Sequence, residues 1–255
     1  IPPNTFYKLP KYLKDLNREK ILGTGRKDHF VGLWVNRNAR RKRPSDVVES
    51  WSIFLNDLEK KHGHRNATLI IHTDPTDQEG PNLVAVSSHL GVSQNVLFSK
   101  ERLDYEKMNV LHNISDFCVN ISYAEGFGLS TLESMMVGNP IVAIKTGGLT
   151  RQVVDHRDGT ENGIALPVEL KSLVGSQHVP YIYEDYVSSE TVASAFMKLY
   201  EMGPEGREAL GNKAKSYADS EFSYQKTIDD WDRTLNELHE NWKNNRKNSW
   251  KVNSI

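Results

Sequence analysis

Short, continuous apolar runs recur along the first two thirds of this chain, and they limit its fold more than any other feature of the sequence. None alternates between apolar and polar residues, as a half-exposed strand does, so each predicts a strand buried on both faces. Five runs are clear and the last is weaker: residues 30–35, 67–71, 95–98, 117–121, 140–144 and 163–166.

Helical patterns lie between these runs. A proline-serine-aspartate sequence at 44–46 begins the first, and apolar residues then recur at helical spacing as far as Leu58. Strands that alternate with helices predict βαβ units with right-handed crossovers. We therefore expect an α/β fold with a doubly wound, Rossmann-like parallel sheet, followed by C-terminal helices after about residue 188.

The chain divides into four parts by composition. The first part begins with two prolines, which hold an extended backbone, and continues with polar residues and the glycines Gly23 and Gly25, so we expect a linker without regular structure. The parts are a linker at 1–28, a Rossmann-like domain at 29–222, a helix at 223–243 and a polar tail at 244–255.

Composition excludes several classes of protein. The formal net charge of −1 over 255 residues argues against a globally basic nucleic-acid binder. No apolar run approaches the roughly 20 residues that a bilayer needs, and no charged-then-apolar leader is visible. Cys118 is the one cysteine, so an internal disulfide and a zinc site of several cysteines are excluded. We expect a cytoplasmic protein with no membrane span and no nucleic-acid partner.

In an open parallel sheet, ligands bind beyond the carboxyl ends of the strands, so the loops there are the first candidates for a site. The loop after the first strand, 36–43, holds five cations among eight residues. Arginine offers a fork to phosphate and lysine a point charge. A solvated basic loop or a nucleic-acid patch is the alternative interpretation of this loop.

The loop after the fourth strand, 122–130, joins two glycines to the start of a helix. Small residues let backbone N–H groups approach a ligand, and a helix N-terminus favours an anion. Glu125 would repel a simple phosphate but suits a ligand that carries hydroxyls beside the phosphate, as a nucleotide-sugar does. Glu133 could accept hydrogen bonds from a ribose diol; the alternative is an exposed helix carboxylate. Gly147 and Gly148 offer a third turn at the same edge, or an ordinary strand-to-helix turn.

The segment 125–142, EGFGLSTLESMMVGNPIV, resembles the Glu-x7-Glu signature of retaining glycosyltransferases of the GT-B type, the group 1 glycosyl transferases. The chain is similar to the C-terminal, donor-binding domain of that family over about residues 1–240. Arg37 and Lys42 resemble its donor-diphosphate clamp in their spacing. The glycine pair 147–148 resembles the one after the family's fifth strand, and residues 1–4 resemble the segment between its two domains.

The resemblance implies a role for each matching residue. The catalytic group would be Glu125 on the donor sugar, with Arg37 and Lys42 on the departing diphosphate. No metal and no cofactor would be needed, because the cations replace the metal, and the substrate would be a UDP- or GDP-linked sugar. Substrate binding would fall to the remaining residues of the signature: Gly126, Phe127, Gly128, Leu129, Ser130 and Glu133.

Several alternatives stay open at this point. The resemblance implies that the family's N-terminal domain, which normally supplies the acceptor site, is missing, so we expect either a fragment of a longer enzyme or a lone donor domain. Its function would be that of a glycosyltransferase donor domain or of a nucleotide-sugar-binding module that is inactive without an N-terminal domain or a second subunit. The acceptor is unknown. An insertion at 169–186 covers a sheet edge or contacts a partner. A nucleic-acid-binding domain leaves Glu125 and Glu133 unexplained, and an oxidoreductase lacks G-x-G-x-x-G after the first strand.

Some residues are expected to be structural. His112 and His156 are predicted to be satisfied or exposed histidines rather than ligands. Cys118 is predicted to be an inert, buried thiol. Trp231 and Trp242 recur at helical spacing and are predicted to pack, although an apolar stripe on this last helix would be exposed, or buried against a second copy, if it belongs against the missing domain.

Overall fold

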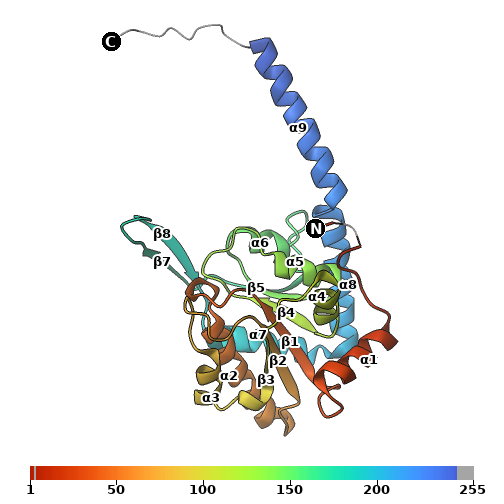
Figure 1. The fold of residues 1–255 in the computed structure, drawn as a ribbon, viewed down its shortest axis with the longest axis vertical. Coiled ribbons are helices and arrows are strands. Elements are labelled where there is room, and N and C mark those ends of the chain that lie inside the picture. The colour runs from red at the N-terminus through yellow and green to blue at the C-terminus, as the bar shows by residue number, and fades with distance from the viewer. Residues whose placement is uncertain (3, 246–255) are drawn as a thin grey trace.

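Six parallel strands form the central sheet of the computed structural model, which describes residues 1–2 and 4–245. Their order across the sheet is β3-β2-β1-β4-β5-β6 (Figure 1), and the expected doubly wound fold is confirmed. Each predicted strand is present, with its ends shifted by a residue or so. The bounds are β1 Phe30–Val35, β2 Ala67–His72, β3 Val96–Ser99, β4 Phe117–Asn120, β5 Ile141–Ile144 and β6 Gly163–Leu166.

The strand order changes direction between β1 and β4. From β1 the chain proceeds outward to β2 and then β3, and β4 returns to pair with β1 on its other side. Ligands of open α/β sheets bind at such a point, in the crevice beyond the carboxyl ends of the two strands. The topology therefore directs attention to the loops that follow Val35 and Asn120.

Helices cover both faces of this sheet. On one side α2 packs against α3 and α7, and on the other α5 contacts α4, α6 and α8. The bounds are α2 Pro44–His62, α3 Leu83–His89, α4 Tyr105–Asn113, α5 Leu129–Met136, α6 Gly147–Val153, α7 Ser189–Glu201 and α8 Gly203–Glu221. Single turns of 3-10 helix occupy Arg40–Lys42 and Ser93–Asn95.

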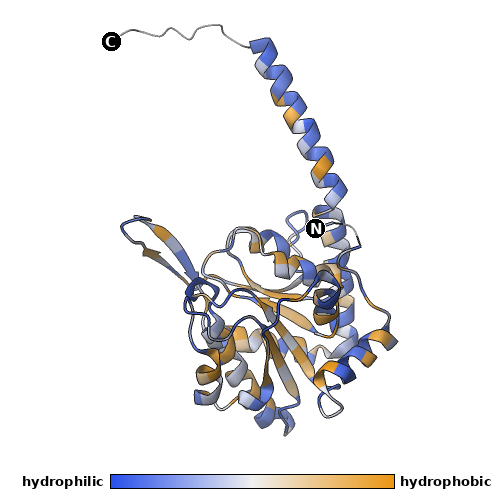
Figure 2. Cartoon of the chain, viewed as in Figure 1, coloured by the Kyte–Doolittle hydropathy of each residue, from blue (hydrophilic) through white to orange (hydrophobic). Residues whose placement is uncertain are grey.

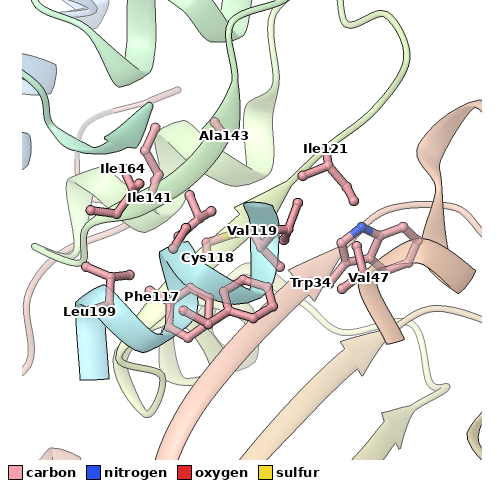
Figure 3. Packing of buried hydrophobic residues seen from close by; sticks show 14 of the residues in the cluster. Trp34, Val47, Phe117, Cys118, Val119, Ile121, Ile141, Ala143, Ile164 and Leu199 are labelled. Carbon is pink, nitrogen blue, oxygen red and sulfur yellow. The ribbon is translucent and has the colours of Figure 1, made fainter. Parts of the chain in front are cut away.

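The core is an aromatic and aliphatic cluster between the sheet and α2 and α7. Trp51 and Phe54 of α2, Phe117 of β4 and Phe196 of α7 are fully buried and lie ring against ring. Figure 3 shows part of this cluster, and Figure 2 shows that the strands are the most hydrophobic elements of the chain. Burial of this surface accounts for continuously apolar strands, because both faces of the sheet are covered.

The predicted linker contains a helix that the sequence analysis did not anticipate. Helix α1, Lys11–Leu22, lies against α4, and Leu22 is its one buried residue. Arg18 of α1 donates to Asp116 (2.9 Å) and to the carbonyl of His29 (2.7 Å). The prediction of an irregular linker at 11–22 is therefore wrong. The sequence of this segment is too polar to indicate a helix, and contacts with distant residues stabilise the helix that forms.

The segment before α1 is bound to α4 by its backbone. The N–H of Tyr7 donates to Asn109 (3.0 Å) and the N–H of Leu9 to Asn113 (2.8 Å), while the Asn113 amide returns a bond to the Tyr7 carbonyl. Phe6 is buried beside them. Two asparagine side chains thus replace the strand or helix partners that an extended segment lacks.

The insertion at 169–186 forms a separate antiparallel hairpin of β7, Leu170–Val174, and β8, Ile182–Tyr186. It projects from the body of the molecule (Figure 1) and, within the described residues, pairs with no strand of the central sheet. Glu184 and Asp185, at its base, are buried, whereas Leu173 and Tyr183 are exposed. The hairpin therefore does not extend an edge of the central sheet.

Helix α9, Tyr224–Asn245, extends away from the body (Figure 1). Trp231 is 62% exposed and Trp242 is 56% exposed, so neither is buried against the body of the molecule, although Trp242 stacks on His239 of the same helix with the ring centres 6.1 Å apart. With them an apolar stripe spaced by three and four residues runs along the helix: Ile228, Trp231, Leu235, Leu238 and Trp242. The helix ends at Asn245, two residues later than predicted, and the rest of the predicted tail, 246–255, lies outside the described residues.

Cys118 offers a direct check of this core. The side chain is fully buried in β4, and burial raises the pKa of its thiol far above the usual range. Since the thiolate is the reactive form, we expect no modification by a thiol-specific reagent such as Ellman's reagent in the folded protein and one thiol per chain in denaturant. Stoichiometric labelling of the folded protein would contradict the placement of β4.

Candidate active site

A cavity of about 420 Å³ opens where β1 and β4 end. It contains seven of the nine residues that the sequence analysis assigned to the site, together with two residues that it did not assign. The lining residues are Val35, Asn36, Lys42, Glu125, Phe127, Gly128, Leu129, Ser130 and Glu133. Two loops distant in sequence, after β1 and after β4, thus meet at the switch in strand order, as expected.

Lys42 and Glu125 form an ion pair across this cavity. Their side chains are only 9% and 12% exposed, so each charge has little water to solvate it. Lys42 ends the short 3-10 turn after β1, and Glu125 lies in the glycine-containing loop after β4. The two central charges of the site therefore neutralise one another.

The loop after β4 presents the N-terminus of α5 to the cavity. Gly128 caps this helix in the left-handed region (φ 90°), a conformation that favours glycine. Gln152 of α6, fully buried, donates to the carbonyls of Phe127 (2.7 Å) and Gly128 (3.1 Å) and accepts from Thr131 (2.6 Å). These bonds hold the loop so that the first N–H groups of α5 remain available to an anion.

The glycine pair after β5 supports this loop from behind. The N–H of Gly148 donates to the carbonyl of Glu125 at 3.1 Å. A Cβ added at Gly147 would lie 2.0 Å from the Glu125 carbonyl oxygen, and one added at Gly148 would lie 2.4 Å from that of Gly126. Neither glycine lines the cavity, so the pair's contribution is to permit a close backbone approach that fixes Glu125.

Glu133 reaches the cavity from the second turn of α5. Its carboxylate Oε2 lies 3.1 Å from Nε2 of His112, which is fully buried on α4. Glu133 itself remains 17% exposed. The interpretation of Glu133 as a freely exposed helix carboxylate is therefore wrong. His112, predicted to be a satisfied or exposed histidine, is buried, and its Nε2 is paired whereas its Nδ1 has no partner among the described residues.

Arg37 does not share the cavity with Lys42. Its guanidinium bonds to Asp77 at 2.9 Å and to Glu79 at 3.0 Å, in the loop after β2, and its side chain is 61% exposed. The hydrogen bond raises the pKa of Arg37 and lowers that of Asp77. We expected both Arg37 and Lys42 to line the cavity, but only Lys42 does. Arg37 lies outside it because two carboxylates of the neighbouring loop attract its guanidinium.

Gly126 is the other predicted residue that does not line the cavity. It is exposed beside Glu125, and its carbonyl faces Gly148 instead. Asn36 and Val35 line the cavity without having been assigned to the site. The sequence could have indicated Asn36, because this residue directly follows the predicted first strand. It gave no indication of Gln152, which resembles any other polar residue of a helix.

The remaining cations of the basic loop are engaged within the protein. Arg40 pairs with Glu184 of the hairpin and Arg43 with Asp46. Arg43 has a left-handed backbone (φ 55°), unusual for a residue with a side chain, and its guanidinium lies 5.0 Å from the ring centre of Tyr123. Four of the five cations in loop 36–43 are thus bound by carboxylates, which argues against a free basic face for nucleic acid.

Three further features of the described chain bear on where a ligand would bind. A larger hollow of about 650 Å³, between α1, β3 and α4, is lined mainly by apolar residues and shares none with the site. Among residues 1–2 and 4–245, no group of three or more histidine, cysteine, aspartate or glutamate residues is placed to hold a metal ion. In the same part of the chain, no helix is both long enough and apolar enough to cross a bilayer.

Comparison with known proteins identifies relatives. The model of the family described as "Glycosyl transferases group 1" matches residues 18–217. A D-inositol 3-phosphate glycosyltransferase 2 of Catenulispora acidiphila is 35% identical over 138 residues, which are 52% of this chain and 31% of that protein. A D-inositol 3-phosphate glycosyltransferase of Acidothermus cellulolyticus is 31% identical over 137 residues, 52% of this chain and 30% of that one.

Solved structures share the fold at low identity. HepE of Anabaena, crystallised with UDP and glucose, superposes with a TM-score of 0.69 at 18% identity over 91% of this chain and 54% of that one. Sucrose-phosphate synthase of Thermosynechococcus elongatus superposes with a TM-score of 0.68 at 20% identity, over 92% of this chain and 50% of that one. The C-terminal domain of LpcC of Francisella tularensis superposes with a TM-score of 0.63 at 18% identity, over 88% of this chain and 99% of that one. The chain spans about half of the first two and about a third of the curated relatives.

Gly148→Ala tests the support of the loop. The added Cβ would meet backbone, which cannot move aside as a side chain can, so we expect a loss of about 1–3 kcal/mol in the free energy of unfolding. Gly126→Ala is the matched control, because its Cβ would meet no described atom within 4 Å. Urea unfolding of both variants is the measurement, and equal stability of the two would show that the approach is not tight.

Proposed function

The chain belongs to the glycosyl transferases group 1 family, and we propose that it is the donor-binding part of a retaining glycosyltransferase that uses a nucleoside-diphosphate sugar. The observation that carries this proposal is the meeting of Lys42, Glu125 and Glu133 with the N-terminus of α5 in one cavity. A cation and a helix end suit a diphosphate, and two carboxylates suit hydroxyl groups on either side of it.

In the proposed reaction the bond from the anomeric carbon to the diphosphate oxygen breaks, and the acceptor's hydroxyl oxygen bonds to that carbon on the same face. The nucleoside diphosphate leaves with the bonding electron pair, and its departing oxygen takes up the proton that the acceptor hydroxyl loses. Negative charge therefore grows on the diphosphate, where Lys42 and the α5 amides would stabilise it without reorganising. Positive charge grows on the sugar, which Glu125 would orient and partly compensate.

Glu125 and Glu133 would divide the donor between them. Glu125 lies in the loop, beside the cation that would meet the diphosphate, and is proposed to accept from hydroxyls of the sugar. Glu133, eight residues later on α5, is proposed to accept from the ribose. The backbone of Phe127, Gly128, Leu129 and Ser130 would lie along the diphosphate between them, with Gly126 at the exposed end of the loop.

Arg37 enters the proposal as a cation that must change partners. It is paired with Asp77 and Glu79 on the exposed side of its loop, and binding a diphosphate would require its guanidinium to leave them. Because the pair is solvent-exposed, breaking it costs little. Arg37 would thus contribute less to binding than Lys42 does.

The donor is proposed to be a UDP- or GDP-linked sugar, with neither metal nor cofactor. A solved relative, HepE, was crystallised with UDP and glucose and again with UDP-glucose, which supports a nucleotide-sugar donor of this kind. Lys42 supplies positive charge at the place where a metal would otherwise be needed. Cytoplasmic location stays a prediction.

The acceptor side is proposed to come from a second domain or subunit, and the exposed stripe of α9 is its docking surface. The chain spans only part of its relatives, and α9 extends beyond the body of this one with its apolar side chains exposed (Figure 1). Should the chain act without that partner, the alternative is a module that binds the nucleotide-sugar and turns nothing over. Calorimetric binding without product in the presence of sugar acceptors would favour the alternative.

Lys42→Ala tests the cation of the site. Removing a charged partner of the diphosphate costs roughly 1.5–3 kcal/mol, so we expect the Kd for UDP or GDP, whichever binds the wild type, to rise by about 10- to 150-fold in calorimetry. Arg37→Ala should raise it only a few fold. Arg41→Ala is the control, since Arg41 is an exposed cation of the same loop that does not line the cavity. An equal rise of the Kd in all three variants would show that the loop attracts the diphosphate by its overall charge and that Lys42 makes no specific contact.

Glu125→Gln separates the sugar from the diphosphate. The variant frees Lys42 and removes a negative charge beside the diphosphate, so the nucleoside diphosphate alone should bind at least as tightly as it does to the wild type. The affinity for the nucleotide-sugar should fall by about 10-fold or more relative to the affinity for the nucleoside diphosphate. The measured quantity is the ratio of the two dissociation constants, and a ratio equal to that of the wild type would show that Glu125 does not contact the sugar.

A further inference from the structure

A buried histidine stands directly behind the cavity. His112 lies in the last turn of α4 with no exposed surface, and its Nε2 is 3.1 Å from Oε2 of Glu133. A carboxylate oxygen accepts and an imidazole nitrogen can donate, so the ring hydrogen of this contact belongs to Nε2. Within the described chain, Oε1 of Glu133 has no hydrogen-bond partner in the protein and is left for a ligand.

The position of His112 is set by three neighbours. Asn139, just after α5, donates to the main-chain carbonyl of His112 at 2.6 Å. The ring of Phe6 meets the imidazole edge-on, with the ring centres 5.6 Å apart and the planes at 88°. Glu133 makes the third contact. Helix α4 and helix α5 are thus joined twice at this point, once through Asn139 and once through the His112 side chain.

Packing alone does not explain a histidine here. Nδ1 of His112 is buried and has no partner among the described residues. A buried polar atom without a partner is unfavourable, and an apolar ring of similar size would fill the same space without that cost. The contact that an apolar ring could not make is the one from Nε2 to Glu133.

We propose that His112 is the positioning residue of Glu133: by donating Nε2–H to Oε2 it fixes the carboxylate so that Oε1 points to the ribose of the donor. This inference rests on the proposed function, because it takes the ligand of Glu133 to be the nucleoside. Without this contact, the Glu133 side chain would have several rotamers open to it in the cavity. Holding it in one of them lowers the entropy lost when the ribose binds.

The position of Phe6 extends this arrangement. Residues 4–10 are bound to α4 by two asparagines, and Phe6 closes over the imidazole of His112. A continuous set of contacts therefore runs from the N-terminal segment through His112 and Glu133 to the cavity. The ribose-facing carboxylate is held by a part of the chain that lies outside the loops of the site.

The test compares a nucleoside diphosphate with its 2′,3′-dideoxy form by calorimetry. UDP and GDP are both tried on the wild type, and the one that binds is carried through. We expect the wild type to prefer the ribose form about 10-fold or more and Glu133→Gln to lose most of that preference. His112→Phe, which keeps a ring of similar volume, should lose about 3- to 10-fold of the preference while affinity for the dideoxy form stays unchanged.

His112→Gln is the matched variant, because its amide nitrogen reaches about as far as Nε2 and can donate to Glu133. It should restore most of the preference that His112→Phe loses. The double variant of His112→Phe with Glu133→Gln should be no worse than Glu133→Gln alone, as expected of two residues that act through one contact. Additive losses would overturn the inference.

Spectroscopy gives a second readout that does not depend on how well His112→Phe folds. In wild-type protein labelled with 15N-histidine, the His112 signals, assigned by their loss in His112→Gln, should show the hydrogen on Nε2, and they should shift when the nucleotide is added. A hydrogen on Nδ1 would overturn the inference. Failure of every nucleotide to bind the wild type would instead overturn the proposed function, whereas a preference lost in Glu133→Gln but kept in His112→Phe would overturn the role of His112 alone.

Discussion

The ion pair of Lys42 with Glu125 joins the loops after β1 and β4, and the rest of the site is arranged around it. Two charges taken out of water on a mostly buried contact add little net stability to a fold, because desolvation offsets most of their attraction. The pair is better explained by the ligand contacts that would take its place. When the proposed donor binds, Lys42 would contact the diphosphate and Glu125 the sugar hydroxyls, so each side chain would lose one polar partner and gain another at small cost in free energy.

Most of the surrounding structure keeps these loops in place before a ligand arrives. The hairpin β7–β8 takes part, because Glu184 binds Arg40 of the first loop and Asp185 accepts from Thr146 (2.7 Å) after β5. The N–H of Asp185 also donates to the carbonyl of Tyr123 (2.9 Å) after β4. An insertion that the family pattern does not require therefore ties three site loops together, and such preorganisation lowers the cost of binding.

The two ends of the chain show why composition alone misleads about order. Residues 11–22 are polar enough to suggest a loop, yet they form α1, because Asp116 at the start of β4 supplies a partner for Arg18. Helix α9 is the reverse case, since its apolar spacing suggests packing and its side chains are exposed. In both segments the outcome depends on a partner distant in sequence or outside the chain, which a local pattern cannot contain.

The sequence by itself determined the six strands of the central sheet, the helices between them and the segment that carries Glu125, Gly128 and Glu133. Each strand is a continuous apolar run in the sequence because both of its faces are buried. Glu125, Gly128 and Glu133 lie in one loop and the helix that follows it, so their spacing along the chain brings them to the same end of that helix. Only the tertiary structure decided which charges meet. Arg37 is bound by Asp77, forty positions away, and Glu133 by His112, because electrostatic partners are chosen by distance in space and by competition among all carboxylates within reach.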